Sequence, residues 1–456
     1  MNRLTLCINS QTPLVRFTSG YTDLVEKYGT LPDPVPLGLL SEGEDYVVAP
    51  GGVPKVVYPL VTRMIERGIA RTAHWICMSP TGPPRVRAGR VIIHHVALDH
   101  PELRAYATMK ERLWEEIHDL ERHPIGPEEF QAYARYNWLC ANKMFELSDV
   151  DLFYVHDFQQ LQVGNMLGLA APTIFRWHIP FDVKHVDPYI RKFIIKCMEA
   201  YDAVIVSCRR DLQGLINAGF HGRVYQVYPY VDERKWTRPT EPEVQDFALT
   251  HTIRADDKVV LVVGRMDPIK GQDVCIKAIA KVVRRIPNVK LVLVGNGSFS
   301  GSRRGGLSHP KSARWRAYLE ELVRKLKMEK HVVFTGYLPD EVLKSAYDRA
   351  DVVVLPSIKE GFGLVVPEAW MYKKPVIVSR GAGASEVIME GINGYTFAPR
   401  NHKELANKLI RVLKKSKLAH SLGKRGRETA KNLSIGRRVK EMANIFQEIL
   451  KSFKTK

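Results

Sequence analysis

The sequence predicts an α/β protein made of two Rossmann-like domains, each with a parallel sheet covered by helices. Short runs rich in valine, isoleucine and leucine alternate with amphipathic stretches along the whole chain. Continuous apolar strands separated by helices are typical of parallel sheets that are buried on both faces. The alternation occurs in two halves joined by a polar, proline-bearing segment, 236–256. We therefore expect two domains whose sheets face one another across a cleft at the carboxyl ends of their strands.

The first domain is expected over residues 1–235, with more interruptions than the second. Residues 10–50, rich in proline and glycine, are expected to form an irregular insertion. The apolar periodicity predicts helices at 54–67, 102–120, 128–147 and 187–199. Strands are expected at 4–10, 72–80, 91–97, 150–157, 172–178, 202–208 and 224–230.

The second domain is expected over residues 257–435, where strands and helices alternate regularly. Strands are expected at 258–266, 289–297, 331–338, 351–357 and 374–380, with helices at 271–287, 314–328, 339–350 and 364–373. A last helix is expected at 436–456, and its packing on the first domain is left open.

Composition narrows the class of protein. The 456 residues suffice for two domains, and 45% hydrophobic with 26% charged residues is typical of globular chains. The longest apolar runs, such as 259–263, are far shorter than a membrane span, and the N-terminus lacks a secretory signal pattern. The six cysteines form no CxxC pair, which argues against a zinc site or disulfide framework. We expect a cytoplasmic protein with no integral membrane segment.

The chain is strongly basic, with 68 Lys and Arg against 49 Asp and Glu and a net charge of +19. Such a charge favours an anionic partner or, alternatively, a diffusely basic surface. Basic stretches occur at 281–290, 324–330 and 414–431, so the diffuse surface is the favoured interpretation. The aromatic and basic spacing of RNA-binding modules is missing, and no nucleic-acid partner is expected.

Polar residues follow several strands of the second domain. Arg265 ends one strand and Lys270 precedes the next helix, which suits two cations meeting a phosphate but also a salt-bridged strand end. Glu360 and Glu368 bracket a Gly-Phe-Gly turn that enters a helix, where backbone amides and the helix start favour an anion. Both glutamates could instead complement the helix dipole. A further glycine-rich turn at 379–387 favours a ligand site.

In the first domain, Gly51 and Gly52 form a turn before a helix, which is weak evidence for a ligand on its own. One strand ends in His156 and Asp157, and the next ends in a cluster that includes His178. A lone strand-end histidine is more often structural, but two successive clusters favour a polar pocket. The HExxH, Walker A and GxSxG motifs are absent from the sequence.

Together the motifs "GRMDPIKG", "VGNG", "NGYTF" and the run from "FTGYL" to "GASEVI" resemble the donor half of retaining GT-B glycosyltransferases, of the family 4 type. The resemblance covers nearly all of 257–400. It implies a nucleotide-diphosphate sugar, such as UDP- or ADP-glucose, as substrate and no required cofactor or metal. It also implies that Arg265 and Lys270 hold the diphosphate, Glu368 the ribose and Glu360 the transferred sugar. The implied donor-binding residues are Gly264, Arg265, Lys270, Glu360, Phe362, Gly363, Leu364 and Glu368.

The first-domain stretches "GGVPKVV", "YVHDFQQL" and "FRWHIPFD" resemble trehalose-forming glucosyltransferases. They are similar to trehalose glycosyltransferring synthases and, in part, to trehalose-phosphate synthases. In these families Asp157 would hold acceptor hydroxyls, and His178 would contact the donor sugar and support the transition state. The implied acceptor-binding residues are Gly51, Gly52, Asp157 and Trp114. The implied catalytic residues are Glu360, His178, Arg265 and Lys270.

The resulting hypothesis is a retaining transferase that forms trehalose from a nucleotide-diphosphate glucose and glucose. The alternatives are a trehalose-phosphate synthase, transfer to another small polyol or lipid acceptor, and a non-catalytic binder of anions or nucleic acid. A homodimer is possible. Apart from Glu360, which stands where trehalose-phosphate synthases have Asp, two departures from the family patterns leave the acceptor open. One is the long segment 10–50, and the other is the basic loop 296–315, where Arg303 or Arg304 could reach an acceptor phosphate or the loop could be a solvated insertion.

Overall fold

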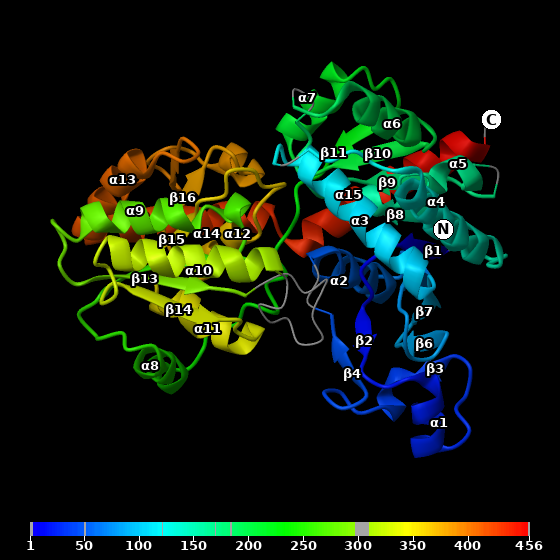
Figure 1. Cartoon of the computed structure of the whole chain (residues 1–456), viewed down its shortest axis with the longest axis horizontal. Coiled ribbons are helices and arrows are strands. Elements are labelled where there is room, and N and C mark those ends of the chain that lie inside the picture. Colours follow the sequence, from blue (N-terminus) through cyan, green and yellow to red (C-terminus); the bar gives the residue numbers. More distant parts are fainter. Residues whose placement is uncertain are drawn as a thin grey trace. The chain divides into compact units, whose positions relative to one another are not determined.

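The computed structural model describes residues 3–49, 52–120, 122–168, 170–182, 185–296 and 310–454. The chain forms two compact units (Figure 1). Unit 1 comprises Met1–Tyr228 and Arg438–Lys456, and unit 2 comprises Pro229–Arg437. The chain therefore crosses from unit 1 to unit 2 directly after its last strand in unit 1 and returns within its final helix.

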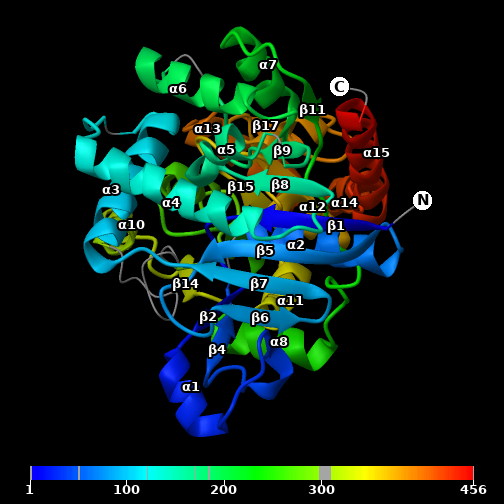
Figure 2. The ribbon, with the colours of Figure 1, turned by 90° about the vertical axis from the view of Figure 1, so that its right-hand side faces the viewer.

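Unit 1 is built on one large sheet. Its described strands are β1 (Leu4–Asn9), β3 (Val35–Pro36), β5 (Ala70–Met78), β6 (Arg85–Ala88), β7 (Val91–Val96), β8 (Leu152–His156), β9 (Thr173–Arg176), β10 (Ala203–Val206) and β11 (Val224–Gln226). Their order is β11-β10-β9-β8-β1-β5-β7-β6-β3. Figure 2 shows β8, β1, β5, β7 and β6 side by side. Neighbours pair in parallel except β6 and β7, which form an antiparallel pair, so the sheet is parallel apart from one edge.

Helices and an aromatic core complete unit 1. The described helices of this unit before Tyr228 are α1 (Tyr21–Tyr28), α2 (Gly52–Glu66), α3 (His100–Ile117), α4 (Pro127–Phe145), α5 (Val163–Leu167), α6 (Pro188–Glu199) and α7 (Arg209–Asn217). Helices α2, α3, α4 and α6 confirm the four predicted helices to within three residues at each end. Tyr106 of α3 packs against Tyr133 and Tyr136 of α4, and all three are buried. The apolar periodicity of these helices therefore identified the faces that cover the sheet.

Residues 10–50 contain regular structure that the sequence analysis missed. Strands β2 (Val15–Phe17) and β4 (Tyr46–Val48) form an antiparallel ribbon, separate from the large sheet. The ribbon is anchored by Phe17, whose buried ring contacts Tyr46 and His95. Strands of three residues carry too few side chains for a visible alternation, which explains why the pattern gave no signal.

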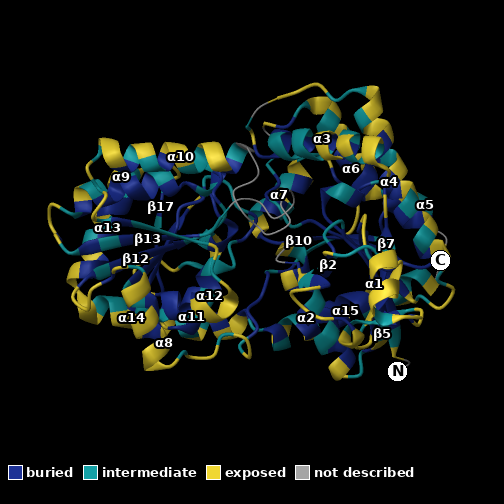
Figure 3. Cartoon of the chain, turned by 60° about the horizontal axis from the view of Figure 1, so that its bottom comes forward, coloured by how far each residue is buried: buried dark blue, intermediate teal, exposed yellow. Residues whose placement is uncertain are grey.

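Unit 2 is built on a second sheet, which is wholly parallel among the described residues. Its strands are β12 (Lys258–Val263), β13 (Val289–Val294), β14 (Val332–Gly336), β15 (Val352–Leu355), β16 (Val376–Ser379) and β17 (Tyr395–Phe397), in the order β14-β13-β12-β15-β16-β17. Its helices are α8 (Glu241–Thr250), α9 (Gln272–Val282), α10 (Pro310–Lys325), α11 (Asp340–Arg349), α12 (Val365–Met371), α13 (His402–Lys414) and α14 (Ser416–Asn432). Helices α9, α11, α12 and α13 contact its strands. In each unit the buried residues gather on the strands and the exposed ones on the outer helix faces (Figure 3).

Of the two segments at the ends of unit 2, the first contains a helix that was not expected and the second is the expected last helix. The predicted connection, 236–256, contains helix α8, which packs on α11 through the buried side chains Val244 and Phe247. Two apolar anchors in a polar stretch are too few to reveal an amphipathic helix by pattern. The last helix, α15 (Ile435–Lys454), enters unit 1, where Phe446 lies edge-on to Tyr154.

Within the described ranges, no helix is both long and apolar enough to cross a membrane. The six cysteines are buried and free.

Candidate active site

Two turns of unit 2 bring an ammonium and a carboxylate together. Lys270 ends the 3-10 turn Pro268–Lys270 that follows β12, and Glu360 lies in the turn that follows β15. Strands β12 and β15 are parallel neighbours, so both turns leave the same edge of the sheet. Lys270 Nζ donates to Glu360 Oε2, and Ser357 Oγ donates to the same oxygen at 3.0 Å. The two side chains are only 18% and 20% exposed, so the pair is shielded from water.

This pairing fixes the protonation state of Glu360. Burial by itself would raise the pKa of the Glu360 carboxyl. The charge and hydrogen bond of Lys270, the Ser357 hydroxyl and the charge of Arg265 outweigh burial, and the pKa of Glu360 falls below its usual value. Glu360 is therefore a carboxylate at neutral pH, ready to accept hydrogen bonds from hydroxyl groups.

Close backbone contacts hold the two turns against one another. Ile358 N donates to Ile269 O at 2.8 Å, which joins the turn after β15 to the turn after β12. Gly271 has φ +67°, and a Cβ there would overlap the carbonyl oxygen of Pro356. Gly363 has φ +104°, and a Cβ there would overlap Leu355. Both positions therefore require glycine, because side chains are disfavoured at positive φ and the space is filled.

Arg265 and Gly264 lie at the start of the first turn. The amide of Gly264 donates to Val294 O at 2.9 Å, which continues the sheet pairing beyond β12. The carbonyl of Arg265 accepts from Gln272 Nε2 at 2.6 Å, which ties the turn to α9. The structure thus brings Gly264, Arg265, Lys270 and Glu360 to one edge of the unit 2 sheet.

Glu368 is held by a partner that the sequence analysis did not identify. It lies in the first turn of α12, after the buried Phe362 and the half-buried Gly363 and Leu364. Tyr347 of α11 donates its hydroxyl to Glu368 Oε2 at 2.7 Å. The Tyr347 ring stacks on Tyr372 with centroids 5.8 Å apart, so the hydroxyl is rigidly placed. Burial, followed by the charge of Glu368, raises the pKa of Tyr347, which therefore stays a neutral donor.

The strand ends of unit 1 carry a buried histidine pair. His156 ends β8, and His178 follows β9, its parallel neighbour. His156 Nδ1 and His178 Nε2 share a hydrogen bond of 3.0 Å. Burial lowers the pKa of both imidazoles, and the charge of Arg176 lowers each further. Both rings are therefore neutral at physiological pH.

Asp157 and Arg176 complete this cluster. Asp157 is 6% exposed with φ +70°, and the amide of His178 donates to its Oδ1 at 3.4 Å. Burial raises the pKa of Asp157 to about 7, although the amides of His178 and Phe158 oppose the rise. Arg176 is buried and donates to Val227 O at 3.1 Å and to Tyr154 Oη at 3.4 Å. The structure therefore joins Asp157 and His178, as the sequence motifs suggested.

The remaining predicted positions are Trp114 and Gly52, which the structure describes, and several that lie outside the described residues. Trp114 stacks on His118 with centroids 4.2 Å apart, on the side of α3 that packs against the core. Gly52 is the first residue of α2, whereas Gly51 lies outside the described residues. Most of the basic loop, including Arg303 and Arg304, also lies outside them.

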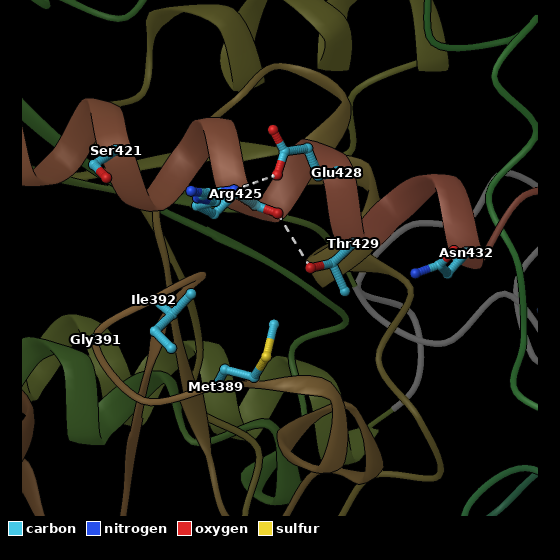
Figure 4. A pocket seen from close by; sticks show the side chains of 8 residues that line it. All are labelled: Met389, Gly391, Ile392, Ser421, Arg425, Glu428, Thr429 and Asn432. Atoms are coloured by element: carbon cyan, nitrogen blue, oxygen red, sulfur yellow. Dashed lines mark hydrogen bonds and ion pairs between the residues drawn. The ribbon is translucent and has the colours of Figure 1, made fainter.

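A hollow of about 560 Å³ lies elsewhere in unit 2, between α14 and the turn 389–392 (Figure 4). Its lining comprises Met389, Gly391, Ile392, Ser421, Arg425, Glu428, Thr429 and Asn432. None of the predicted site residues that the structure describes is among them, so this hollow is separate from the polar clusters above.

Known family models match one segment in each half of the chain. Residues 246–429 match the family model "Glycosyl transferases group 1", and residues 98–213 match "Trehalose synthase, N-terminal domain". An uncharacterized glycosyltransferase of Methanocaldococcus jannaschii is 37% identical over 35% of this chain and 37% of its own length. A trehalose synthase of Thermococcus litoralis is 26% identical over 84% of this chain and 83% of that protein.

Similarity to solved structures identifies the fold. An Escherichia coli structure described as trehalose-6-phosphate bound with UDP-2-fluoro glucose has a TM-score of 0.74 and 16% identity, covering 97% of this chain and 98% of that one. At this identity the likeness concerns the fold alone. The two matched domains, the parallel sheets and the polar strand ends lead to one conclusion. The chain therefore has the GT-B fold, and its residues 98–213 and 246–429 match the trehalose synthase N-terminal domain and the glycosyl transferases group 1 family, respectively.

Proposed function

We propose that this chain transfers glucose from a nucleotide-diphosphate glucose to glucose and forms trehalose with retained configuration. The observation that carries the proposal is the Lys270–Glu360 pair, held with Arg265 at a strand edge of the group 1 domain. The N-terminal match to trehalose synthases supports the choice of product. Unit 2 would bind the nucleotide sugar, and unit 1 the acceptor.

On the donor side, Arg265 and Lys270 would meet the diphosphate, and Gly264 would allow close approach of the backbone. Glu360 would accept hydrogen bonds from the transferred sugar, beside the amides of Phe362, Gly363 and Leu364. Glu368, fixed by Tyr347, would accept from the ribose hydroxyls. Preorganised cations of this kind stabilise a departing diphosphate without a metal.

On the acceptor side, Asp157 would hold the acceptor hydroxyls, and neutral His178 would contact the donor sugar. Gly51, Gly52 and Trp114 would complete the acceptor site. The acceptor oxygen would form the new bond on the face from which the diphosphate leaves. The bond from the anomeric carbon to the phosphate oxygen breaks, and the diphosphate takes the acceptor proton. A cytoplasmic location, a possible homodimer and the absence of a nucleic-acid partner stay predictions.

A second candidate is a trehalose-phosphate synthase with glucose 6-phosphate as acceptor. The similar E. coli structure, whose description contains trehalose-6-phosphate, favours its inclusion. The two candidates share the donor chemistry and differ only in the acceptor.

The test is a product screen of UDP- and ADP-glucose against glucose and glucose 6-phosphate, read by mass and anomeric configuration. We expect α,α-trehalose from free glucose, and its loss in Glu360→Ala and Lys270→Ala. Lys277→Ala is the matched control, because Lys277 also forms an ion pair in unit 2, with Asp273 on α9. Product formed only from glucose 6-phosphate would select the second candidate. Unchanged turnover in Glu360→Ala or Lys270→Ala would contradict the site assignment.

A further inference from the structure

The positive charge of the chain is concentrated in one segment of unit 2. Residues 400–437 contain twelve Lys and Arg against two Asp and Glu, a net charge of +10 in 38 residues, whereas the whole chain carries +19. About half of the excess charge thus belongs to α13, α14 and their junctions, which differs from the diffuse surface favoured by the sequence analysis. The transferase site uses none of these residues.

Helix α14 arranges part of this charge in a line. Lys417, Lys424 and Lys431 are seven residues apart, just under two helical turns, so they project along one side of the helix. All three are exposed, and the opposite side of α14, with Leu422 and Ala430, is buried in unit 2. The line of lysines is about 21 Å long at the rise of an α-helix.

None of these lysines forms an ion pair among the described residues, although Glu428 lies four residues after Lys424 and three before Lys431 on α14. Arg425, on the same exposed side, pairs with Glu428 at 3.0 Å, so that carboxylate is already neutralised. Glu390, on the turn near α14, is bound by Lys408. Among the described residues, no carboxylate lies within ion-pair distance of the three lysine ammonium groups.

Two exposed apolar side chains lie on the turn opposite α14, beside Arg425 of that helix. Met389 and Ile392 are 49% and 51% exposed, and they lie on the turn that faces α14 across the hollow in Figure 4. Nucleic-acid surfaces add aromatic side chains for base stacking, and neither the hollow nor the lysine line has one. Exposed methionine and isoleucine that share a hollow with Arg425, on the helix that carries the lysine line, instead match the boundary between lipid headgroups and acyl chains.

We propose that this α14 face, defined as Lys417, Lys424, Lys431, Met389 and Ile392, docks on an anionic lipid surface. The lysines contact headgroup phosphates and carboxylates, while Met389 and Ile392 enter the interfacial layer. The inference is independent of the acceptor used by the enzyme.

The test is flotation of the full-length protein with vesicles of phosphatidylcholine alone or with added phosphatidylserine. We expect binding only to the anionic vesicles, weakened by salt. The variant K417E/K424E/K431E should bind about a hundredfold more weakly, since each cation near such a surface contributes about fivefold in affinity. The matched control is K281E/R284E/R285E, which makes the same charge change at exposed positions in and just after the last turn of α9 and should retain binding.

The variant M389S/I392S separates lipid docking from general attraction to anions. It should lose most of the binding that remains at high salt, because only the apolar contribution resists screening. Thermal unfolding of each variant reports whether the fold is intact. Equal losses in the two charge-reversal variants, retained binding in K417E/K424E/K431E, or binding of an RNA oligonucleotide without vesicle binding would each overturn the proposal.

Discussion

The polar cluster at the strand ends of unit 2 holds its charges in pairs, whereas the cluster at the strand ends of unit 1 keeps its aspartate and its two histidines neutral beside the buried cation Arg176. In unit 2, Lys270 and Ser357 keep Glu360 ionised despite burial. In unit 1, burial keeps Asp157 protonated up to about pH 7 and His178 uncharged. Both clusters follow parallel strands, so sheet topology sets the place of a site and the local counter-charges set its protonation.

This difference predicts opposite responses to pH. Glu360 has a lowered pKa, so its charge is constant across the neutral range. Asp157, with a raised pKa, and His178, with a lowered one, both change charge when the pH leaves the window in which they are neutral. Variants that remove one counter-charge or one titrating group therefore test whether the two clusters differ in their response to pH.

The largest expected effect is in a double-mutant cycle across the unit 2 pair. Lys270→Met and Glu360→Gln should each lower kcat/KM about 10²- to 10³-fold, since each removes preorganised charge from the site. The double variant should lose little more than the worse single variant, because the two side chains act as one unit. The ratio of wild-type to Glu360→Gln activity should stay flat from about pH 5 to 8, because Glu360 is ionised throughout.

Additive losses would contradict this cycle, because they would mean that Lys270 and Glu360 act separately. Lys277→Ala in the same assay controls for the loss of an ion pair as such.

The intermediate effect concerns stability and Asp157. Its folded-state pKa of about 7 exceeds its unfolded value, so the folded state binds the proton more tightly. The stability that it contributes is complete below the unfolded pKa and is lost as pH rises through 7. The free energy of unfolding should therefore fall by about 2 kcal/mol between pH 5 and 7 from this group alone.

In Asp157→Asn the side chain at this position cannot ionise. The variant should therefore lack the part of the dependence of the unfolding free energy on pH that Asp157 causes, as measured by urea unfolding at several pH values. Asp182→Asn, which alters an aspartate that is not buried, is the control. An Asp157→Asn slope identical to the wild-type slope would show that Asp157 is ionised in the folded protein.

The sequence drew attention to Arg265, Lys270 and Glu360 because they follow apolar strands, whereas their roles in donor binding come from the family resemblance and stay predictions. Lys270 and Glu360 are 90 residues apart, yet parallel topology brings their strand ends together, so the pattern alone suggested their proximity. Their supporting groups gave no such signal. Ser357 is one hydroxyl in a loop, and Tyr347 reaches Glu368 only through the packing of α11 beside α12. Helix α8 was missed because only Val244 and Phe247 anchor it. Contacts that depend on tertiary packing produce no periodic pattern in the sequence.

The smallest expected effect concerns Arg176 and the neutral state of His178. The buried guanidinium lowers the pKa of His178 by repulsion, second to burial. Arg176→Met removes that repulsion, so the pKa of His178 should rise, and more imidazolium should be present at any given acidic pH. The acid limb of kcat/KM should therefore move to higher pH.

Arg176→Lys keeps the charge and should leave the limb in place, which separates electrostatics from packing, because Arg176 also contacts Met442 of α15. A packing defect would instead lower kcat/KM at all pH values and lower the unfolding temperature, without moving the limb. The acid limb of the pH dependence of kcat/KM could stay fixed in Arg176→Met, or it could move equally in Arg176→Lys. Either result would mean that burial alone keeps His178 neutral. The difference in protonation between the two clusters would then result from desolvation in unit 1 and from charge pairing in unit 2, and the charge of Arg176 would have no part in it.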